Sequence, residues 1–163
     1  MKPYPTFDET VSLLNDVLVA YQRSTTPSSS VIASSRIFED PMTVIGLIEA
    51  GIPYGLFEQI QRVLSFSEQE WAGFLELSTK SLQRYKAEAN FRFKGFQAQR
   101  ILEVTELMQA GYAFFGELSK LNHWLNTPAF VFDGRKPIEL LHDSYGKSLL
   151  LSTLHRMQHG IYI

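Results

Sequence analysis

The sequence contains no cysteine, and this absence excludes several kinds of chemistry at once. Without thiols the chain can form neither disulfides nor sulfur-ligated metal sites, and it carries no cysteine nucleophile. The fold must therefore be held together by packing. Hydrophobic residues make up 45% of the 163 positions, which is enough to build a substantial core.

Long hydrophobic runs are also missing. No segment approaches the roughly 18 consecutive apolar residues that a membrane-spanning helix needs. The beginning, MKPYPTFDE, lacks the basic and then apolar pattern of a secretory signal. We therefore expect a soluble protein of the cytoplasm that does not enter membranes. Strand patterns are equally scarce, since the apolar runs at 129–132 and 161–163 are too short for a sheet, and we expect an all-α fold.

A general excess of basic residues is absent, because the net charge is -2. Positive charge is nevertheless concentrated locally, since residues 79–100 hold six basic residues against the single acid Glu88. A short basic segment in an acidic chain favours a small nucleic-acid footprint, although a solvated basic helix face explains it equally well. The six basic residues are Lys80, Arg84, Lys86, Arg92, Lys94 and Arg100.

The first fifty residues predict two helices and a linker. Apolar residues recur at helical spacing over 7–22, and Thr6 with Glu9 fits a capping box. Residues 23–35 contain eight Ser or Thr, which is typical of a flexible linker. A second helix is expected over 41–50, framed by Asp40 as N-cap and a glycine after its end.

A helix pair follows that has the spacing of a helix-turn-helix. Ser67 is placed to cap EQEWAGFL, and Ser78 is placed to cap TKSLQRYKAEA. In the second helix Leu82 should pack inward while the polar residues face outward. Arginine and glutamine suit base edges, whereas lysine suits phosphates; the alternative is ordinary solvent exposure. The expected DNA-binding residues are Thr79, Lys80, Ser81, Gln83, Arg84 and Lys86.

The C-terminal half predicts further helices. A long, largely buried helix is expected over 94–116, followed by GELSKLNHWLN, a short helix at PIELLHD, and a last helix over about 147–159 that Gly160 ends. An apolar stripe through this region indicates a dimer interface. The residues of the stripe are Phe114, Phe115, Leu118 and Leu121.

Catalytic and metal-binding patterns are not supported. His155 and His159 are four apart, but Arg156 stands where a metalloprotease needs Glu, and no third ligand is evident. The run His142-Asp143-Ser144 is best explained as polar loop residues, since no nucleophile elbow accompanies it. We therefore expect no metal, no cofactor and no enzymatic activity. An enzyme that works through one of the three histidines is the remaining alternative.

Residues 124–160, WLNTPAFVFDGRKPIELLHDSYGKSLLLSTLHRMQHG, resemble the Xre-like toxin-binding antitoxins, also called the MbcA/ParS family. With the helix pair, the resemblance covers roughly residues 40–162. The chain departs from the family at Ala129, where Asn is usual, at His159, where an aromatic residue is common, and at 80–84, where the family tends to have Arg-Thr-x-x-Arg. The matching positions are Trp124, Leu125, Pro128, Gly134, Pro137, Leu140, Leu141, Gly146, Leu154 and Gly160.

The resemblance implies an Xre-like helix-turn-helix domain over 36–110 and a toxin-binding and dimerisation domain over 111–163, with 1–35 as an N-terminal helix and linker. It implies a homodimer that represses its own operon by binding operator DNA. It also implies a RES-domain toxin partner that consumes NAD or transfers ADP-ribose. A stand-alone dimeric transcription regulator is the alternative. Expected toxin-binding residues are Asp133, Gly134, Arg135, Lys136, Lys147, Arg156, Gly160, Ile161, Tyr162 and Ile163.

Overall fold

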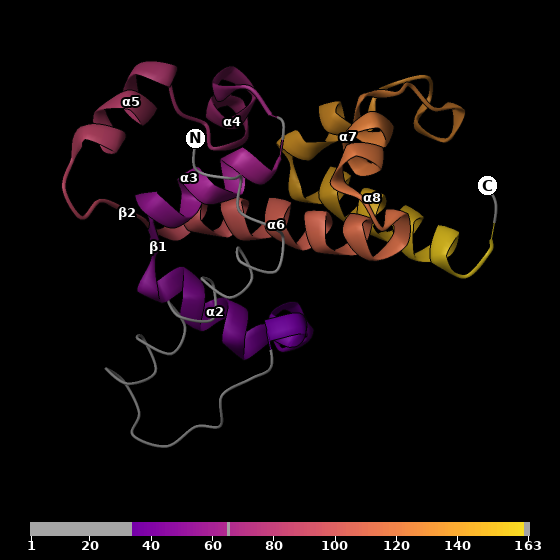
Figure 1. Cartoon of the computed structure of the whole chain (residues 1–163), viewed down its shortest axis with the longest axis horizontal. Coiled ribbons are helices and arrows are strands. Elements are labelled where there is room, and N and C mark those ends of the chain that lie inside the picture. Colours follow the sequence, from indigo (N-terminus) through magenta and orange to yellow (C-terminus); the bar gives the residue numbers. More distant parts are fainter. Residues whose placement is uncertain (1–33, 65, 162–163) are drawn as a thin grey trace.

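The computed structural model describes residues 34–64 and 66–161, and over these the fold is all-α, as predicted. The longest helix, α6, lies along the long axis of the molecule (Figure 1). The helices α3, α4 and α5 gather around its N-terminal half, and α7 and α8 pack against it toward its other end. The short helix η3 packs against α7, α8 and α4. The helical elements are η1 (Ser34–Glu39), α2 (Pro41–Ala50), α3 (Tyr54–Val63), α4 (Glu68–Phe74), α5 (Thr79–Ala87), α6 (Gly95–Phe115), α7 (Leu118–Asn126), η2 (Phe130–Phe132), η3 (Pro137–His142) and α8 (Ser144–Gln158).

Local capping signals place the first helices correctly. The Asp40 carboxylate accepts the amides of Met42 and Thr43 at the start of α2, and Gly51 follows its end with a φ of 77°. Ser67 and Glu70 form a reciprocal capping box at the start of α4. The helix predicted over 7–22 lies outside the described residues. So does most of the linker, although its last residues, 34 and 35, belong to η1.

One pair of short strands has no counterpart in the prediction. β1 (Ile52–Pro53) pairs antiparallel with β2 (Arg92–Phe93), with Ile52 opposite Phe93. Two residues are too few to show a strand periodicity, so the sequence carries no signal for them. This ladder brings the start of α3 next to the start of α6.

The core around α3, α4 and α5 is aromatic. Phe57, Trp71, Phe74 and Phe93 are almost completely buried. The Phe57 ring contacts Trp71 and Phe93 edge to face, with centroid separations of 5.1 and 4.8 Å. Such pairs are stabilising beyond the area that they bury. The core continues along the buried face of α6 into the C-terminal half, where Leu121, Leu150 and Leu154 are fully buried.

The last helix begins earlier than the sequence indicated. α8 starts at Ser144, and the Asp143 carboxylate caps it by accepting the Gly146 amide at 2.8 Å. The interpretation of His142-Asp143-Ser144 as polar loop residues was therefore wrong, since they form the end of η3 and the start of α8. Gly160 ends the helix as predicted, with a φ of 69°.

Within the described ranges 34–64 and 66–161, none of the helices combines the length and the apolar composition that crossing a bilayer requires.

Candidate functional site

The helices α4 and α5 are joined by the short turn 75–78. The turn closes through a hydrogen bond from the Leu77 amide to the Ala72 carbonyl at 2.9 Å. Glu76 adopts the left-handed conformation, with a φ of 53°. Leu75 in the turn and Leu82 on α5 are fully buried against the aromatic core. The two helices are therefore held in a fixed relation by buried side chains on both sides of the turn.

The outward face of α5 is polar, as the sequence predicted. Thr79, Lys80, Gln83 and Arg84 are exposed, while Leu82 alone on this helix is buried. Ser81 differs from the other predicted DNA-binding residues, because its amide donates to the Ser78 hydroxyl at 3.0 Å. Ser81 thus contributes to the cap of α5 and is only partly exposed.

Three of the six basic residues in the segment 79–100 are engaged within the protein. The Lys86 ammonium lies 2.9 Å from a Glu58 carboxylate oxygen, and Arg92 donates to the Gly51 carbonyl at 2.9 Å. Arg100 is only 2% exposed, so counting it as part of a basic surface was wrong. Lys80, Arg84 and Lys94 are exposed and form no ion pair within the described residues. Arg92 is also exposed and its hydrogen bonds go to neutral carbonyls, so these four residues carry the positive charge of this surface.

The Lys86–Glu58 contact links α5 to α3 and changes the titration of both groups. The hydrogen bond from Lys86 is the main cause that lowers the pKa of the Glu58 carboxyl, and desolvation opposes it. The same bond raises the pKa of Lys86. Lys86, a predicted phosphate contact, is therefore fixed on the side of α5 next to α3.

The loop between α7 and η3 carries four of the predicted toxin-binding residues. Asp133 and Gly134 both have positive φ, 55° and 76°, which reverses the chain. The loop closes on itself through a hydrogen bond from the Ala129 amide to the Arg135 carbonyl at 3.2 Å. All four predicted residues of the loop are exposed: Asp133, Gly134, Arg135 and Lys136.

Phe130, at the tip of this loop, was missed by the sequence analysis. Its side chain is 99% exposed, whereas Phe132 two residues later is buried against Trp124. An apolar residue two positions from a buried one carries no signal that distinguishes it from the core. A fully exposed phenylalanine in the same loop as Arg135 and Lys136 gives the loop both apolar and cationic side chains for contact.

Two more of the predicted toxin-binding residues, Lys147 and Arg156, lie on α8, and Gly160 and Ile161 follow its end. Lys147 donates to Glu106 on α6 at 2.7 Å, and its side chain is only 16% exposed. Arg156 lies about 14 Å further along the helix, from the rise per residue, and donates to the Ser152 carbonyl. The structure therefore does not bring these two side chains together. Tyr162 and Ile163 lie outside the described residues.

The end of α8 has the geometry of a Schellman cap. The Gly160 amide donates to the Met157 carbonyl at 3.1 Å, and the Ile161 amide donates to the Arg156 carbonyl at 3.0 Å. The Ile161 side chain is 56% exposed after this cap. The outer face of α8 adds two exposed residues that the sequence analysis did not single out, Tyr145 and Leu149, which are one helical turn apart.

A shallow apolar pocket of about 470 Å³ lies on the surface of α7. Half-buried Phe115 and Trp124 line it, together with Ser119, Lys120, His123 and Thr127. Leu121, which we predicted as part of an exposed stripe, is fully buried and fills the space beside Gly111 on α6. The apolar surface of this region is therefore smaller than the sequence suggested.

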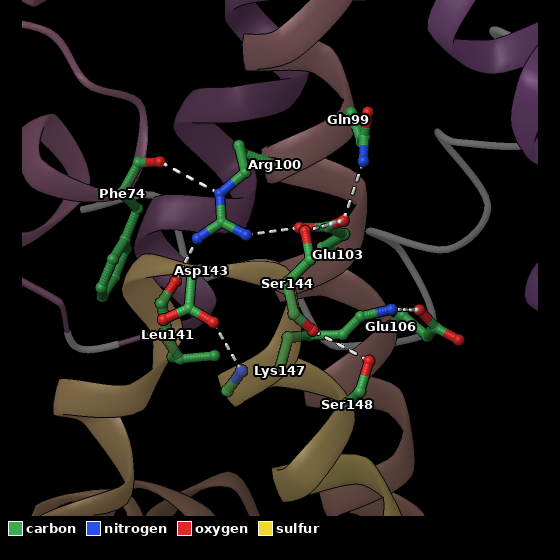
Figure 2. A network of polar contacts seen from close by, with 11 residues as sticks. Phe74, Gln99, Arg100, Glu103, Glu106, Leu141, Asp143, Ser144, Lys147 and Ser148 are labelled. Carbon is green, nitrogen blue, oxygen red and sulfur yellow. Dashed lines mark hydrogen bonds and ion pairs between the residues drawn. The ribbon is translucent and has the colours of Figure 1, made fainter.

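A buried polar network joins α6 to the elements on both sides of it (Figure 2). The Arg100 guanidinium donates to the Phe74 carbonyl at 3.3 Å and to the Leu141 carbonyl, and it pairs with Glu103. The Ser144 hydroxyl donates to Glu103 at 3.1 Å. This network could not be predicted from the sequence, because the two carbonyls that Arg100 binds are 26 and 41 residues away from it.

The three histidines considered for catalysis are not gathered in one place. His142 lies before α8, and His155 lies near its end, about 20 Å away along the helix axis. His159 follows that helix as its C-cap. Over residues 34–64 and 66–161, no group of three or more acidic or histidine side chains is placed to hold a metal ion.

One family matches the C-terminal part of the chain. Residues 110–160 match the family described as antitoxin Xre/MbcA/ParS C-terminal toxin-binding domain, which confirms the resemblance stated above. The expected domain boundary at 110–111 lies within α6, where this match begins. No curated protein matches the chain.

Among solved structures, the chain is similar to a chain in the crystal structure of the M. tuberculosis MbcT-MbcA toxin-antitoxin complex. The two are 20% identical, with a TM-score of 0.50. The similarity covers 65% of this chain and 93% of the other. At this identity the likeness shows a shared helical fold.

Proposed function

We propose that the protein neutralises a RES-domain toxin by direct binding, because residues 110–160 match the family of Xre/MbcA/ParS C-terminal toxin-binding domains. The family match over this domain is the observation that carries the proposal. The exposed loop with Phe130, Arg135 and Lys136 supports it, because aromatic and arginine side chains are frequent anchors of protein interfaces. On this proposal the protein is a binding protein without a catalytic role.

We place the toxin contacts on this loop and on the end of α8. The first test is a truncation after His159, which removes the Schellman cap and the exposed Ile161. The truncated protein should fail to rescue cells that express the toxin encoded beside its gene, and it should still bind DNA. Full rescue would show that the toxin is held elsewhere.

A second variant tests the loop separately from the end of the helix. Phe130→Ser with Arg135→Ala should weaken toxin binding in a pull-down at least tenfold, because it removes an exposed aromatic anchor and an adjacent charge. The matched control is Arg84→Ala, which removes an exposed charge on α5, outside residues 110–160. Equal loss in both variants would contradict the assignment of the loop.

We further propose that α4 and α5 form a helix-turn-helix with which the protein represses its own operon in the cytoplasm. The exposed polar face of α5 supports this, with Arg84 suited to guanine and Gln83 to adenine edges. Lys80→Ala with Arg84→Ala should weaken binding to DNA from upstream of its gene by about tenfold or more and flatten its salt dependence. Arg135→Ala, which removes an exposed charge outside α4 and α5, is the control, and unchanged affinity in the double variant would refute this role of α5.

We also propose that the protein is a homodimer, as its resemblance implies. The apolar pocket lined by Phe115 and Trp124 on α7 supports a protein contact there. Light scattering at tens of micromolar should give twice the mass of the 18.6 kDa chain. Ser119→Arg, which places a charge at the rim of this pocket, should shift the mass toward that of one chain.

A further inference from the structure

Arg100 occupies an unusual position for a charged residue. Its side chain is 3% exposed and lies on the face of α6 between the two halves of the molecule. Glu103, one turn later on the same helix, is 12% exposed and neutralises it. A buried ion pair of this kind is costly unless hydrogen bonds satisfy both groups. The groups that form hydrogen bonds with Arg100 and Glu103 therefore indicate which elements this ion pair joins.

The guanidinium group donates hydrogen bonds to carbonyls at the ends of two helices. The Phe74 carbonyl belongs to the last residue of α4, immediately before the turn that leads to α5. The Leu141 carbonyl lies at the end of η3, inside the toxin-binding domain. Terminal helix carbonyls lack partners within their own helix, and a cation stabilises them. A guanidinium has five N–H donors in a fixed planar fork, so its separate nitrogens can bind two such carbonyls and a carboxylate together.

The network continues from Glu103 into the first turn of α8. Glu103 accepts the Ser144 hydroxyl, and Glu106 accepts Lys147 one turn further along both helices. The side chains of Arg100, Glu103 and Ser144 thus form one connected path from the end of α4 to the start of α8 (Figure 2).

A second contact joins α4 to η3. The Phe74 ring lies 5.3 Å from the His142 ring, between centroids. A side-chain carbon on Gly73 would approach His142 to 3.2 Å, so α4 and η3 are closely packed. A shift of η3 and the start of α8 therefore disturbs α4 through two independent contacts, one polar and one aromatic.

We propose that Arg100 and Glu103 are a positioning pair through which toxin binding on residues 110–160 raises the affinity of α5 for DNA. This inference rests on the proposed function of both surfaces. A toxin that holds η3 and α8 in place also fixes the Leu141 carbonyl and the Ser144 hydroxyl. These two groups in turn hold the guanidinium that binds the last carbonyl of α4. The helix pair then loses less conformational freedom when it binds DNA, which is favourable coupling between two sites.

The experiment uses the full-length protein and the toxin encoded beside its gene. The dissociation constant for duplex DNA from upstream of the gene is measured with and without saturating toxin. In the wild type the toxin should lower this constant at least fivefold, which is in the usual range of coupling between sites. In Arg100→Met with Glu103→Gln the change should fall below twofold. This double variant removes both charges together and leaves neither one buried alone.

The matched control is Thr105→Val. It removes a buried hydrogen bond from the Thr105 hydroxyl to the Ile101 carbonyl within α6, which reaches neither α4 nor α8, so the fivefold effect of the toxin should persist. If thermal unfolding shows that the Arg100 double variant is not folded, Arg100→Lys replaces it, because a lysine cannot bind both carbonyls in one plane.

The outcomes separate the inference from the function on which it rests. A wild type that binds both ligands with no effect of toxin on DNA affinity overturns the inference alone. So does a coupling that survives in the Arg100 variant or disappears equally in the control. A wild type that binds no toxin or no DNA overturns the proposed function, and the inference with it.

Discussion

Gly146 lies in the first turn of α8, where a side chain would collide with the backbone of η3. An added Cβ would stand 1.9 Å from the Leu140 carbonyl oxygen. Alanine normally stabilises a helix relative to glycine, but here α8 approaches η3 too closely for any side chain. Gly146→Ala should therefore lower the free energy of unfolding by about 1–3 kcal/mol, as overpacking does. Chemical denaturation of the purified wild type and variant measures this change in the free energy of unfolding.

Gly55 is the matched control for this prediction. It lies in the first turn of α3, and an added Cβ would find no atom within 4 Å. Gly55→Ala should stabilise the protein by about 0.4–1 kcal/mol, chiefly by restricting the unfolded chain. The two glycine-to-alanine substitutions, both in first turns, should thus change the free energy of unfolding in opposite directions. A change in the same direction would show that contact with η3 is not what requires glycine at 146.

The contact between α3 and α5 makes stability depend on pH. The pKa of Glu58 is lowered below 4.5 by its bond from Lys86, so the folded protein holds this carboxyl ionised more strongly than the unfolded chain does. The stabilisation is fully present above about pH 4.5 and is lost as the pH falls through the lowered value. Because both groups are partly solvated, it amounts to less than about 1 kcal/mol.

A double-mutant cycle over pH tests this contact. Glu58→Gln, Lys86→Met and the double variant should give a coupling energy under about 1 kcal/mol at pH 7. The coupling should vanish below the lowered pKa of Glu58, and also at alkaline pH once Lys86, whose pKa is raised above 10.5, loses its proton. A coupling that does not change with pH would mean that the two side chains interact by packing rather than by charge.

The helices were predictable wherever the signal is local. Capping residues such as Asp40, Ser67 and Ser78 act within three positions, so the sequence alone places the starts of α2, α4 and α5. The start of α8 was misplaced because its cap, Asp143, directly follows another helical element. The outward face of α5 was likewise predictable, from the spacing around Leu82.

Features that depend on distant partners were not predictable. Arg100 looks like any other basic residue of its segment, and only the fold reveals that carbonyls from α4 and η3 surround it. The exposure of Phe130 depends in the same way on how its loop turns at Asp133. Periodicity tells which face of a helix is apolar, but it does not identify which element covers that face.

At the scale of the whole molecule, α6 is shared by both halves. Its buried residues pack against α2 and the aromatic core at one end and against α7 and α8 at the other. A helix of 21 residues that contributes to two groups of elements cannot unfold in one half and leave the other half intact. We therefore expect a single cooperative unfolding transition for residues 34–161 rather than two.

The two tryptophans of the chain allow each half to be followed separately. Trp71 is fully buried beside Phe57, whereas Trp124 is half-buried on α7. In Trp71→Phe the remaining tryptophan emission comes from the C-terminal half, and in Trp124→Phe it comes from the N-terminal half. Within each variant, the urea midpoint from fluorescence should coincide with the midpoint from circular dichroism at the same protein concentration.

A midpoint that differs between the two probes would show that the halves unfold independently. The position of Arg100 makes this outcome informative, because its hydrogen bonds to Phe74 and Leu141 span the two halves. Arg100→Met with Glu103→Gln should separate the transitions more than Lys147→Met with Glu106→Gln does, since only the first pair reaches α4. If neither variant separates them, packing along α6 is sufficient to hold the two halves in one cooperative unit.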